Sequence, residues 1–318
     1  MLAAVEADPL AAAVSLRWLG GLHHLALLGR EPWAGLWPPS AREADEGDLT
    51  EAISRAWRDE RRHLQAALAR PPQTNEVMRS AVLLPGLLHV AAALRRPLHL
   101  AEIGSSAGLN LWCDHYRHDP GPWAWGDPAA ALTLRTEWHG QAPPTDAPLV
   151  VARRAGCDLA PIDLAQPGED LRLASFVWAD QRERLARLQA AMAVARPLQS
   201  ASLVLHAAGA GEFVRRQLAA RREGEAFVLM HSIVWQYIDA DEQQAVTAQM
   251  LAAGARATPD APVAWLRLEP PRPELPVALS CTLWPGGHEQ RLAEAHPHGS
   301  WVRWGAGGGD APMAASPA

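Results

Sequence analysis

The chain has 318 residues, of which 48% are hydrophobic and 20% are charged, and its formal net charge is −6. This composition is typical of a globular protein with one large domain, or with a core and a smaller accessory unit, and it excludes a disordered chain. All 29 basic residues are arginine, which excludes chemistry through a lysine Schiff base, and the absence of a basic excess argues against a nucleic-acid partner.

The sequence has three widely separated cysteines in no Cys-x-x-Cys pattern: Cys113, Cys157 and Cys281. They argue against a disulfide framework and a thiolate zinc site, and they favour a reducing, cytoplasmic location. The spaced pairs His115/His118 and His296/His298 lack a matching carboxylate or cysteine, so no metal site is predicted. No signal peptide and no uninterrupted apolar run long enough to span a bilayer is recognised, so no membrane association is expected.

Helical periodicity dominates the first 96 residues and predicts an N-terminal helical cap or lid over 1–96. The predicted helices cover residues 11–28, 49–69 and 75–94. Pro85-Gly86 is expected to kink or split the third helix. The polar stretch before it has two interpretations: a helix N-terminus with its capping acid, or a lid that places Asn75, Glu76 and Arg79 over a ligand.

From residue 97 the pattern changes to alternating strands and helices. Strands are predicted at 98–102, 149–152, 203–205, 227–230 and 263–268, with an edge hairpin formed by 279–284 and 300–304. Residues 119–148, rich in Pro, Gly and Trp, are interpreted as an insertion, with a short strand at 132–138, and 306–318 as a disordered tail. The prediction for 97–305 is therefore an α/β core with a doubly wound, mostly parallel, Rossmann-like sheet and an antiparallel edge strand.

The most specific motif lies at Leu98 to Asn110, where an apolar run ends in Glu102 and a turn of small residues follows. The spacing is Glu-x-Gly-x-x-x-Gly, which is neither a dinucleotide fingerprint nor a phosphate loop with its lysine. In a strand–turn–helix layout the backbone N–H groups are expected to point at an anionic or polar ligand. Gly104 and Gly108 would permit a positive φ or close backbone approach.

This motif resembles the first motif of class I S-adenosylmethionine-dependent methyltransferases. The resemblance implies that the acid and the turn hold the methionine part and the ribose of the cofactor. The residues that it would assign to cofactor binding are Glu102, Gly104, Ser105, Ser106, Ala107, Gly108 and Asn110. The alternative is an ordinary strand-to-helix turn of an α/β protein.

Other candidate residues fall at predicted carboxyl ends of strands, the edge at which doubly wound sheets bind ligands. Asp158 resembles the acid that pairs with the ribose hydroxyls in these methyltransferases, and His206 ends the third strand. His231, after the fourth strand, is the candidate general base for methyl transfer. The alternative for His231 is a buried histidine that hydrogen-bonds the backbone.

Substrate candidates follow in two further segments. Trp235, Gln236 and Tyr237 could frame a methyl acceptor, or they could open the next helix. Asp127 lies in the insertion, where specificity residues often occur, or it caps a turn.

A wider set of motifs resembles a bacterial family of unknown function whose core is regarded as similar to the methyltransferase fold. The resemblance extends from about residue 11 to 304. The motifs that carry it are Thr74-Asn75-Glu76, Glu102 to Asn110, Trp125 to Pro128, Pro161-Ile162-Asp163, Val177 to Gln181 and His231-Ser232. One departure concerns the segment His206-Ala207-Ala208-Gly209, where the family pattern has a Gly-Asp-Ala whose aspartate would meet the adenine.

The hypothesis is an S-adenosylmethionine-dependent methyltransferase that acts on an unidentified small molecule. The alternative is a non-catalytic protein of methyltransferase fold that binds a nucleoside-like metabolite or a protein partner. The missing acid after the third strand favours the alternative, and the intact turn after Glu102 favours the enzyme. The sequence leaves the methyl acceptor and the oligomeric state open.

Overall fold

The computed structural model describes residues 13–37, 46–178, 180–272 and 275–305. The chain divides into a helical unit of residues 1–75 and 162–193 and a sheet unit of residues 76–161 and 194–318. This division differs from the expected boundary at residue 96, because the last N-terminal helix belongs to the sheet unit and a later segment joins the helical unit. The expected tail, 306–318, lies outside the described residues.

The helical unit is built from short amphipathic helices. They are α1 (Val14–Leu27), α2 (Trp33–Leu36), α3 (Glu46–Asp59), α4 (Arg61–Ala69) and α6 (Glu169–Ala174). Their apolar positions recur at helical spacing and form one core that includes Leu22, Leu25 and Leu64. The longer helix α7 (Arg182–Ser202) begins in this unit and ends in the sheet unit.

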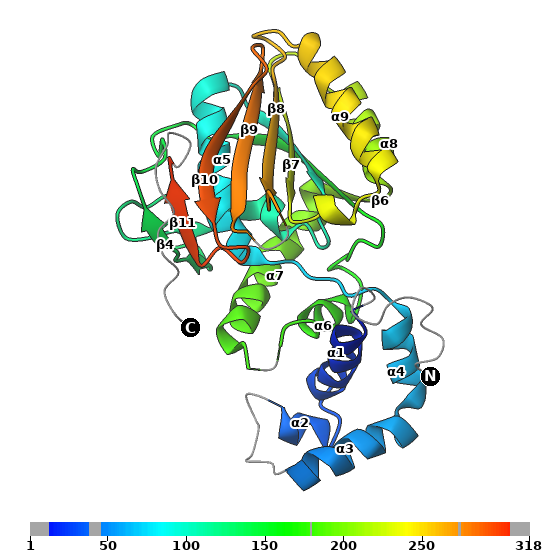
Figure 1. Ribbon diagram of the computed structural model, residues 1–318. Helices are drawn as coiled ribbons and strands as arrows, with labels where there is room; N and C mark the ends of the chain where they lie inside the picture. The colour runs from blue at the N-terminus through cyan, green and yellow to red at the C-terminus, as the bar shows by residue number, and fades with distance from the viewer. Residues whose placement is uncertain (1–12, 38–45, 179, 273–274, 306–318) are drawn as a thin grey trace. The chain divides into compact units, whose positions relative to one another are not determined.

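The sheet unit contains a nine-stranded sheet of order β4-β11-β10-β9-β8-β7-β1-β5-β6 (Figure 1). Its strands are β1 (Leu98–Ile103), β4 (Glu137–His139), β5 (Val151–Asp158), β6 (Leu203–Ala207), β7 (Ala226–Ser232), β8 (Val263–Glu269), β9 (Val277–Trp284), β10 (His288–Ala295) and β11 (Trp301–Trp304). The five strands from β6 to β8 run parallel, and β8, β9, β10 and β11 pair antiparallel in turn. A mixed α/β fold with a large, mostly parallel sheet is thereby confirmed.

Helices cover both faces of this sheet. α5 (Ser80–Leu94) packs on one face, where a β-carbon on Gly86 would lie 2.8 Å from the Leu266 side chain. α8 (Ala210–Ala219) and α9 (Ala240–Ala255) pack on the other, where Ala101 and Ile103 share a core with Phe213 (Figure 1). Because side chains alternate along a strand, Glu102 points to the α5 face.

The stretch Val77–Leu94 is long and apolar enough to cross a membrane by length and composition. The stretch contains Arg79, Ser80 and His89, so it is not an uninterrupted apolar run, and the prediction that no such run spans a bilayer is not contradicted. In the structure 72% of the stretch is buried, and every residue of α5 from Ser80 to Leu88 is buried within the sheet unit. Its apolar character has a packing explanation, because it lies against β8 and β9.

Several helices of the structure begin, break or end at residues other than those predicted. The helix predicted over 49–69 breaks at Glu60, whose φ of −110° and ψ of 24° lie outside the helical region. The helix predicted over 75–94 is a 3₁₀ turn, η2 (Val77–Arg79), followed by α5, which continues through Pro85 instead of splitting.

The strands of the structure differ from the predicted ones mainly near the C-terminus and in the insertion. The turn at 285–287 connects β9 to β10, and β11 pairs with β10, so the predicted hairpin of 279–284 with 300–304 is wrong. The strand predicted at 132–138 is two: β3 (Thr133–Leu134), paired with β2 (Arg117–His118) in a second sheet, and β4. β4 is the outermost strand and pairs parallel to β11. Because the three pairings from β8 to β11 are antiparallel, β11 and β4 run opposite to the five parallel strands, so the strand at this edge is reversed relative to them.

Candidate functional site

The order of the strands reverses at β1. From β1 the chain continues through β5 to β6 on one side, and then passes to β7 and β8 on the other. The carboxyl ends of β1 and β7 form the switch point, where sheets of this kind bind ligands. The carboxyl ends of these two strands and of their neighbours β5 and β8 carry four polar side chains: Glu102 on β1, Asp158 on β5, His231 on β7 and Glu269 on β8.

Glu102 is the centre of a buried polar network. It is 2% exposed, and its carboxyl is hydrogen-bonded with Asn110, whose Oδ1 accepts a 2.7 Å bond from Ser80 Oγ. Glu102 Oε2 is buried without a hydrogen-bond partner among the described residues. Burial, with the charge of Asp158, raises the pKa of Glu102 to about 8 against the opposing effects of Arg79 and Asn110. The carboxyl is therefore mostly protonated at pH 7 and can donate a hydrogen bond.

The turn after β1 uses its N–H groups internally. The Ser105 N–H donates to the Cys157 carbonyl at 2.9 Å, and the Gly108 N–H donates to the Ser105 carbonyl at 2.7 Å. The Ser106 N–H donates to Asp158 Oδ2 at 3.1 Å. These three groups do not point outward, which corrects the expectation from the sequence. The Ser105 and Ser106 bonds fasten the turn to the end of β5, and the Gly108 bond closes the turn on itself.

Packing and backbone conformation explain the small residues of the turn. Gly104 and Gly108 have φ of 67° and 71°. A β-carbon on Gly104 would lie 2.5 Å from Val234 Cγ2, and one on Gly108 would lie 2.8 Å from Leu203 Cδ2. Ser106 also has a positive φ, 51°, and its buried Oγ has no partner among the described residues. The turn is thus tightly packed, with one orphaned hydroxyl.

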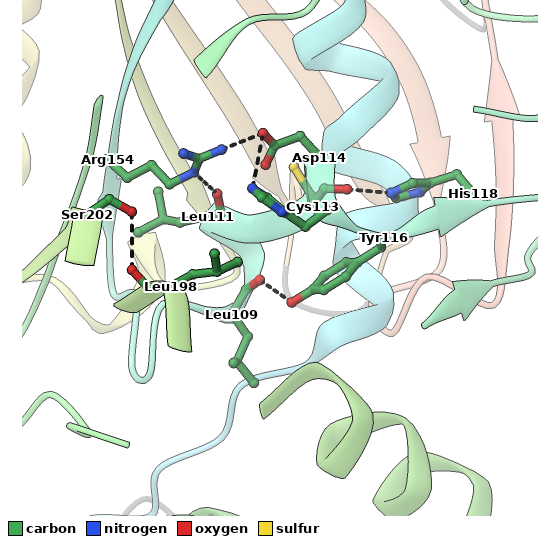
Figure 2. Close-up of polar contacts among 10 residues, drawn as sticks. Leu109, Leu111, Cys113, Asp114, Tyr116, His118, Arg154, Leu198 and Ser202 are labelled. Atoms are coloured by element: carbon green, nitrogen blue, oxygen red, sulfur yellow. Dashed lines mark hydrogen bonds and ion pairs between the residues drawn. The ribbon is translucent and has the colours of Figure 1, made fainter. Parts of the chain in front are cut away.

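The segment after the turn is a 3₁₀ helix, η3 (Leu109–His115), with a break at Trp112, in place of the predicted α-helix. Figure 2 shows how Arg154 of β5 fixes it: Nε donates to the Leu111 carbonyl at 2.9 Å, and Nη2 pairs with Asp114. The Arg154 side chain is only 8% exposed. This brace positions η3, and with it the Asn110 amide.

His231 lies inside β7, one of two strands at the switch point, and is 1% exposed. Its Nδ1 is 2.7 Å from Glu269 Oε1, an oxygen that also accepts the N–H groups of Val234 at 3.2 Å and Trp235 at 3.4 Å. The imidazole stacks on Trp235 with ring centroids 4.9 Å apart. Nε2 is buried without a partner among the described residues. A histidine oriented by a carboxylate in this way has the arrangement of a general base.

Glu102 and His231 occupy opposite faces of the sheet. His231 contacts the ring of Trp265, which belongs to the core on the α8 and α9 face, whereas Glu102 bonds Asn110 on the α5 face. Arg79 links the two residues at the edge of the sheet. Its Nη1 donates to the Ser232 carbonyl, next to His231, at 3.0 Å, and its charge lowers the pKa of Glu102. The structure therefore places two polar centres at one edge of the sheet.

The remaining cofactor candidates differ in position. Ser105 and Ala107 are fully buried. Asp158 accepts a bond from the Ala160 N–H at 3.0 Å, in addition to the bond from the Ser106 N–H. His206 faces α8, where its Nε2 is 3.5 Å from the Gln217 amide nitrogen, so it lies on the opposite face of the sheet from Glu102.

The substrate candidates do not gather at one place. Asp127 is exposed and accepts the Ala129 N–H at 2.8 Å, which is the turn-capping alternative. Gln236 and Tyr237 are exposed in η4 (Trp235–Tyr237), and only Trp235 contacts His231. Glu76 and Arg79 belong to the sheet unit, whereas Asn75 belongs to the helical unit.

Two functional candidates escaped the sequence analysis, Glu269 and Ser80. Glu269 follows the predicted fifth strand directly, so an acid at a strand's carboxyl end was the available signal. Nothing in the sequence pattern links Ser80 to Asn110. Among the described residues no group of three or more His, Cys, Asp or Glu side chains is arranged to hold a metal ion.

Comparison with known proteins gives one match. A family model described as "Uncharacterized protein conserved in bacteria (DUF2332)" matches residues 1–304. No curated protein and no solved structure matches the chain. The match covers nearly the whole sequence, and the chain therefore belongs to this family of proteins conserved in bacteria.

Proposed function

We propose that the protein is an S-adenosylmethionine-dependent methyltransferase that acts on a small molecule, with the cofactor held at the carboxyl ends of β1 and β5. The observation that carries the proposal is the pair of buried orphaned atoms there, Glu102 Oε2 and Ser106 Oγ. A buried polar atom without a partner costs roughly 1–3 kcal/mol. A polar ligand that bonds these atoms would recover that energy.

The donors and acceptors suit the amino-acid and ribose parts of the cofactor. The carboxylate of Asp158 accepts two backbone N–H groups beside the turn, and it is the acid that would accept bonds from the ribose hydroxyls. Glu102, mostly protonated at pH 7, can donate a bond to a carboxylate, and in its ionised form it can accept one from an ammonium group. The segment 207–209 offers no acid to the adenine, so the fit covers only part of the cofactor.

Bound S-adenosylmethionine supplies an electrophilic methyl group. The protein would hold the acceptor and remove its proton, and His231 is the residue for that step. Glu269 accepts the Nδ1 proton of His231, which leaves Nε2 as the proton acceptor. Since His231 is 1% exposed, an acceptor reaches Nε2 only when side chains around the imidazole move.

The second candidate is a non-catalytic protein that binds a nucleoside-like metabolite or a protein partner. Two observations favour it: the turn's N–H groups at Ser105, Ser106 and Gly108 are already bonded, and Val234 occupies the space beside Gly104. A binding protein needs no base within reach of the ligand, which agrees with the placement of Glu102 and His231 on opposite faces.

Calorimetry with S-adenosylmethionine and S-adenosylhomocysteine tests the cofactor site. We expect binding by the wild-type chain and about tenfold weaker binding by Asp158→Asn, since one charge-assisted bond contributes about 1.5 kcal/mol. Asp260→Asn is the matched control, because its exposed carboxylate pairs with Arg96 elsewhere. Absence of binding by the wild type would contradict the methyltransferase proposal.

Methyl transfer separates the two candidates. Cofactor labelled in its methyl group is incubated with the protein and a bacterial small-molecule extract, and label in the extract is counted. The enzyme proposal predicts transfer by the wild type and its loss in His231→Gln, with cofactor affinity retained. Cofactor binding without any transfer would support the second candidate.

A further inference from the structure

The helical unit has a cavity of about 320 Å³, open to solvent, that is lined by residues of α1, α4 and α6 and the residues next to α6. All of its lining residues belong to that unit, and none of them takes part in the methyl transfer proposed above. The volume lies in the range of roughly 300–1,000 Å³ typical of small-molecule sites. An inference from this cavity is therefore independent of the proposed function.

Small residues line part of the cavity. Gly20 and Gly21 of α1 and Ala66 and Ala67 of α4 have no side chain longer than a methyl group. A β-carbon on Gly21 would lie 2.9 Å from the Ala67 Cβ, and one on Gly20 would lie 3.1 Å from the Phe176 ring, so the two glycines let α1 pack closely against α4 and Phe176. The Phe176 ring and the Ala66 methyl group form an apolar part of the wall, which suits a flat, apolar group.

Two imidazoles provide the polar part of the wall. The rings of His24 and His63 are stacked, with centroids 5.1 Å apart and planes within 8°. His63 Nε2 lies 3.1 Å from the Gly21 carbonyl, to which it donates. Burial, followed by the charges of His63 and His23, lowers the pKa of His24 to about 4. His24 is therefore neutral at pH 7, and its ring can stack on an aromatic ligand.

The charged lining residues leave one positive charge in excess. Arg172 pairs with Glu169 at 2.7 Å, so these two charges compensate each other. Arg70, at the end of α4, is exposed beside the same cavity. The surroundings that keep His24 uncharged disfavour a cationic ligand, whereas Arg70 attracts an anion.

We infer that this cavity binds a small aromatic carboxylate, whose ring lies against Ala66 and Phe176 and whose carboxylate pairs with Arg70. Ring and charge make separable contributions. The ring is recognised by shape and apolar contact, and the charge by an exposed guanidinium, whose contribution is at most about 1 kcal/mol.

A matched pair of probes tests this assignment on the full chain. Naphthalene-2-carboxylate and the uncharged naphthalene-2-carboxamide have nearly the same shape, and their affinities are measured by calorimetry at pH 7. We expect the carboxylate to bind about fivefold more tightly, the equivalent of about 1 kcal/mol. Arg70→Gln should remove that preference and leave the affinity for the carboxamide unchanged. Arg58→Gln, an exposed arginine of α3 outside the cavity, should retain the preference.

The place at which the probes bind is tested by a substitution that fills the cavity and by the resonances of the lining histidines. Ala66→Trp, checked for its fold by circular dichroism, should lose both probes. In the wild type, the ring-proton resonances of His24 and His63 should shift when the carboxylate is added, a readout that does not depend on how the variant folds. The inference is overturned by no binding of either probe, by a preference that survives Arg70→Gln, or by unshifted histidine resonances at saturation.

Discussion

Glu102 is an acid that the fold holds in its neutral form, and this has a defined effect on stability. Its pKa is raised from an ordinary 4.5 to about 8 in the folded chain. Between these values the folded state keeps a proton that the unfolded state has lost, so the free energy of unfolding falls as pH rises, by about 1.4 kcal/mol per pH unit. The stabilising contribution is complete below pH 4.5 and is lost by about pH 8.

Glu102→Gln should remove this dependence, because an amide stays neutral while its oxygen still accepts a bond from Asn110. We expect the wild-type free energy of unfolding to fall by about 2 kcal/mol between pH 6.5 and 8, and that of the variant to stay level. Urea titrations at both pH values measure it. Glu137→Gln, at a side chain that is 68% exposed, is the control and should follow the wild type. A fall in Glu102→Gln equal to that of the wild type would refute the assignment.

The contact between His231 and Glu269 is predicted to couple the two residues in stability. Each single alanine variant leaves a buried partner group unsatisfied, so together the two single losses should exceed the loss in the double variant. A double-mutant cycle by urea unfolding should give a coupling of about 1.5–3 kcal/mol, the contribution of a charge-assisted hydrogen bond. Additive losses would mean that Glu269 acts only as the cap of the Val234 and Trp235 N–H groups.

At the scale of elements, the contact of α5 with the sheet depends on the absence of a side chain at Gly86. A β-carbon there would lie 2.8 Å from Leu266 and 3.1 Å from Leu279. Gly86→Ala gains up to about 1 kcal/mol of helix propensity but costs about 1–3 kcal/mol by overpacking, so a net loss is expected. For Gly211→Ala on α8, the nearest atom would be 3.6 Å from the new β-carbon. This variant should therefore gain helix propensity without an overpacking cost. Thermal midpoints that move in opposite directions would verify this contrast.

The elements most visible in the sequence are those buried on a continuous face. β1 and β7, in which every residue is buried, appear as apolar runs, and the parallel strands were predicted from them. β10 was missed because its first four residues are exposed and polar, and its place depends on pairing with β9. Such pairing is a long-range property that local patterns do not contain.

The sequence analysis could not tell that His231 and Glu102 lie on different faces of the sheet, because it placed the end of one strand too early. His231 was placed after a strand ending at residue 230, whereas β7 continues to Ser232. Within a strand the side-chain period of two fixes the face, and His231 and Glu102 therefore lie on opposite sides of the sheet. The ends of β1, β6, β7 and β8 were predicted to within two residues, whereas β5 ends six residues later than predicted. Which face of the sheet each side chain occupies depends on the pairing of β7 with β1.

At the scale of the whole molecule, the two units should respond differently to pH. In the sheet unit, burial lowers the pKa values of His99 and His118 to about 4. In the helical unit burial likewise lowers the pKa values of His23 and His24. Unfolding lets these histidines bind protons below pH 6.5, so both units gain stability as pH rises toward 6.5.

Above pH 6.5 the histidines are neutral in both states, and the units should diverge. The sheet unit alone contains Glu102, so its stability should fall toward pH 8, while that of the helical unit stays level. Hydrogen exchange with mass spectrometry, corrected for the intrinsic rate at each pH, resolves the units by peptide. Protection in β7 should peak near pH 6.5, and protection in α1 should reach a plateau there. A common decline in both peptides would mean that they open as one cooperative body, and a common plateau would mean that Glu102 is ionised in the folded chain.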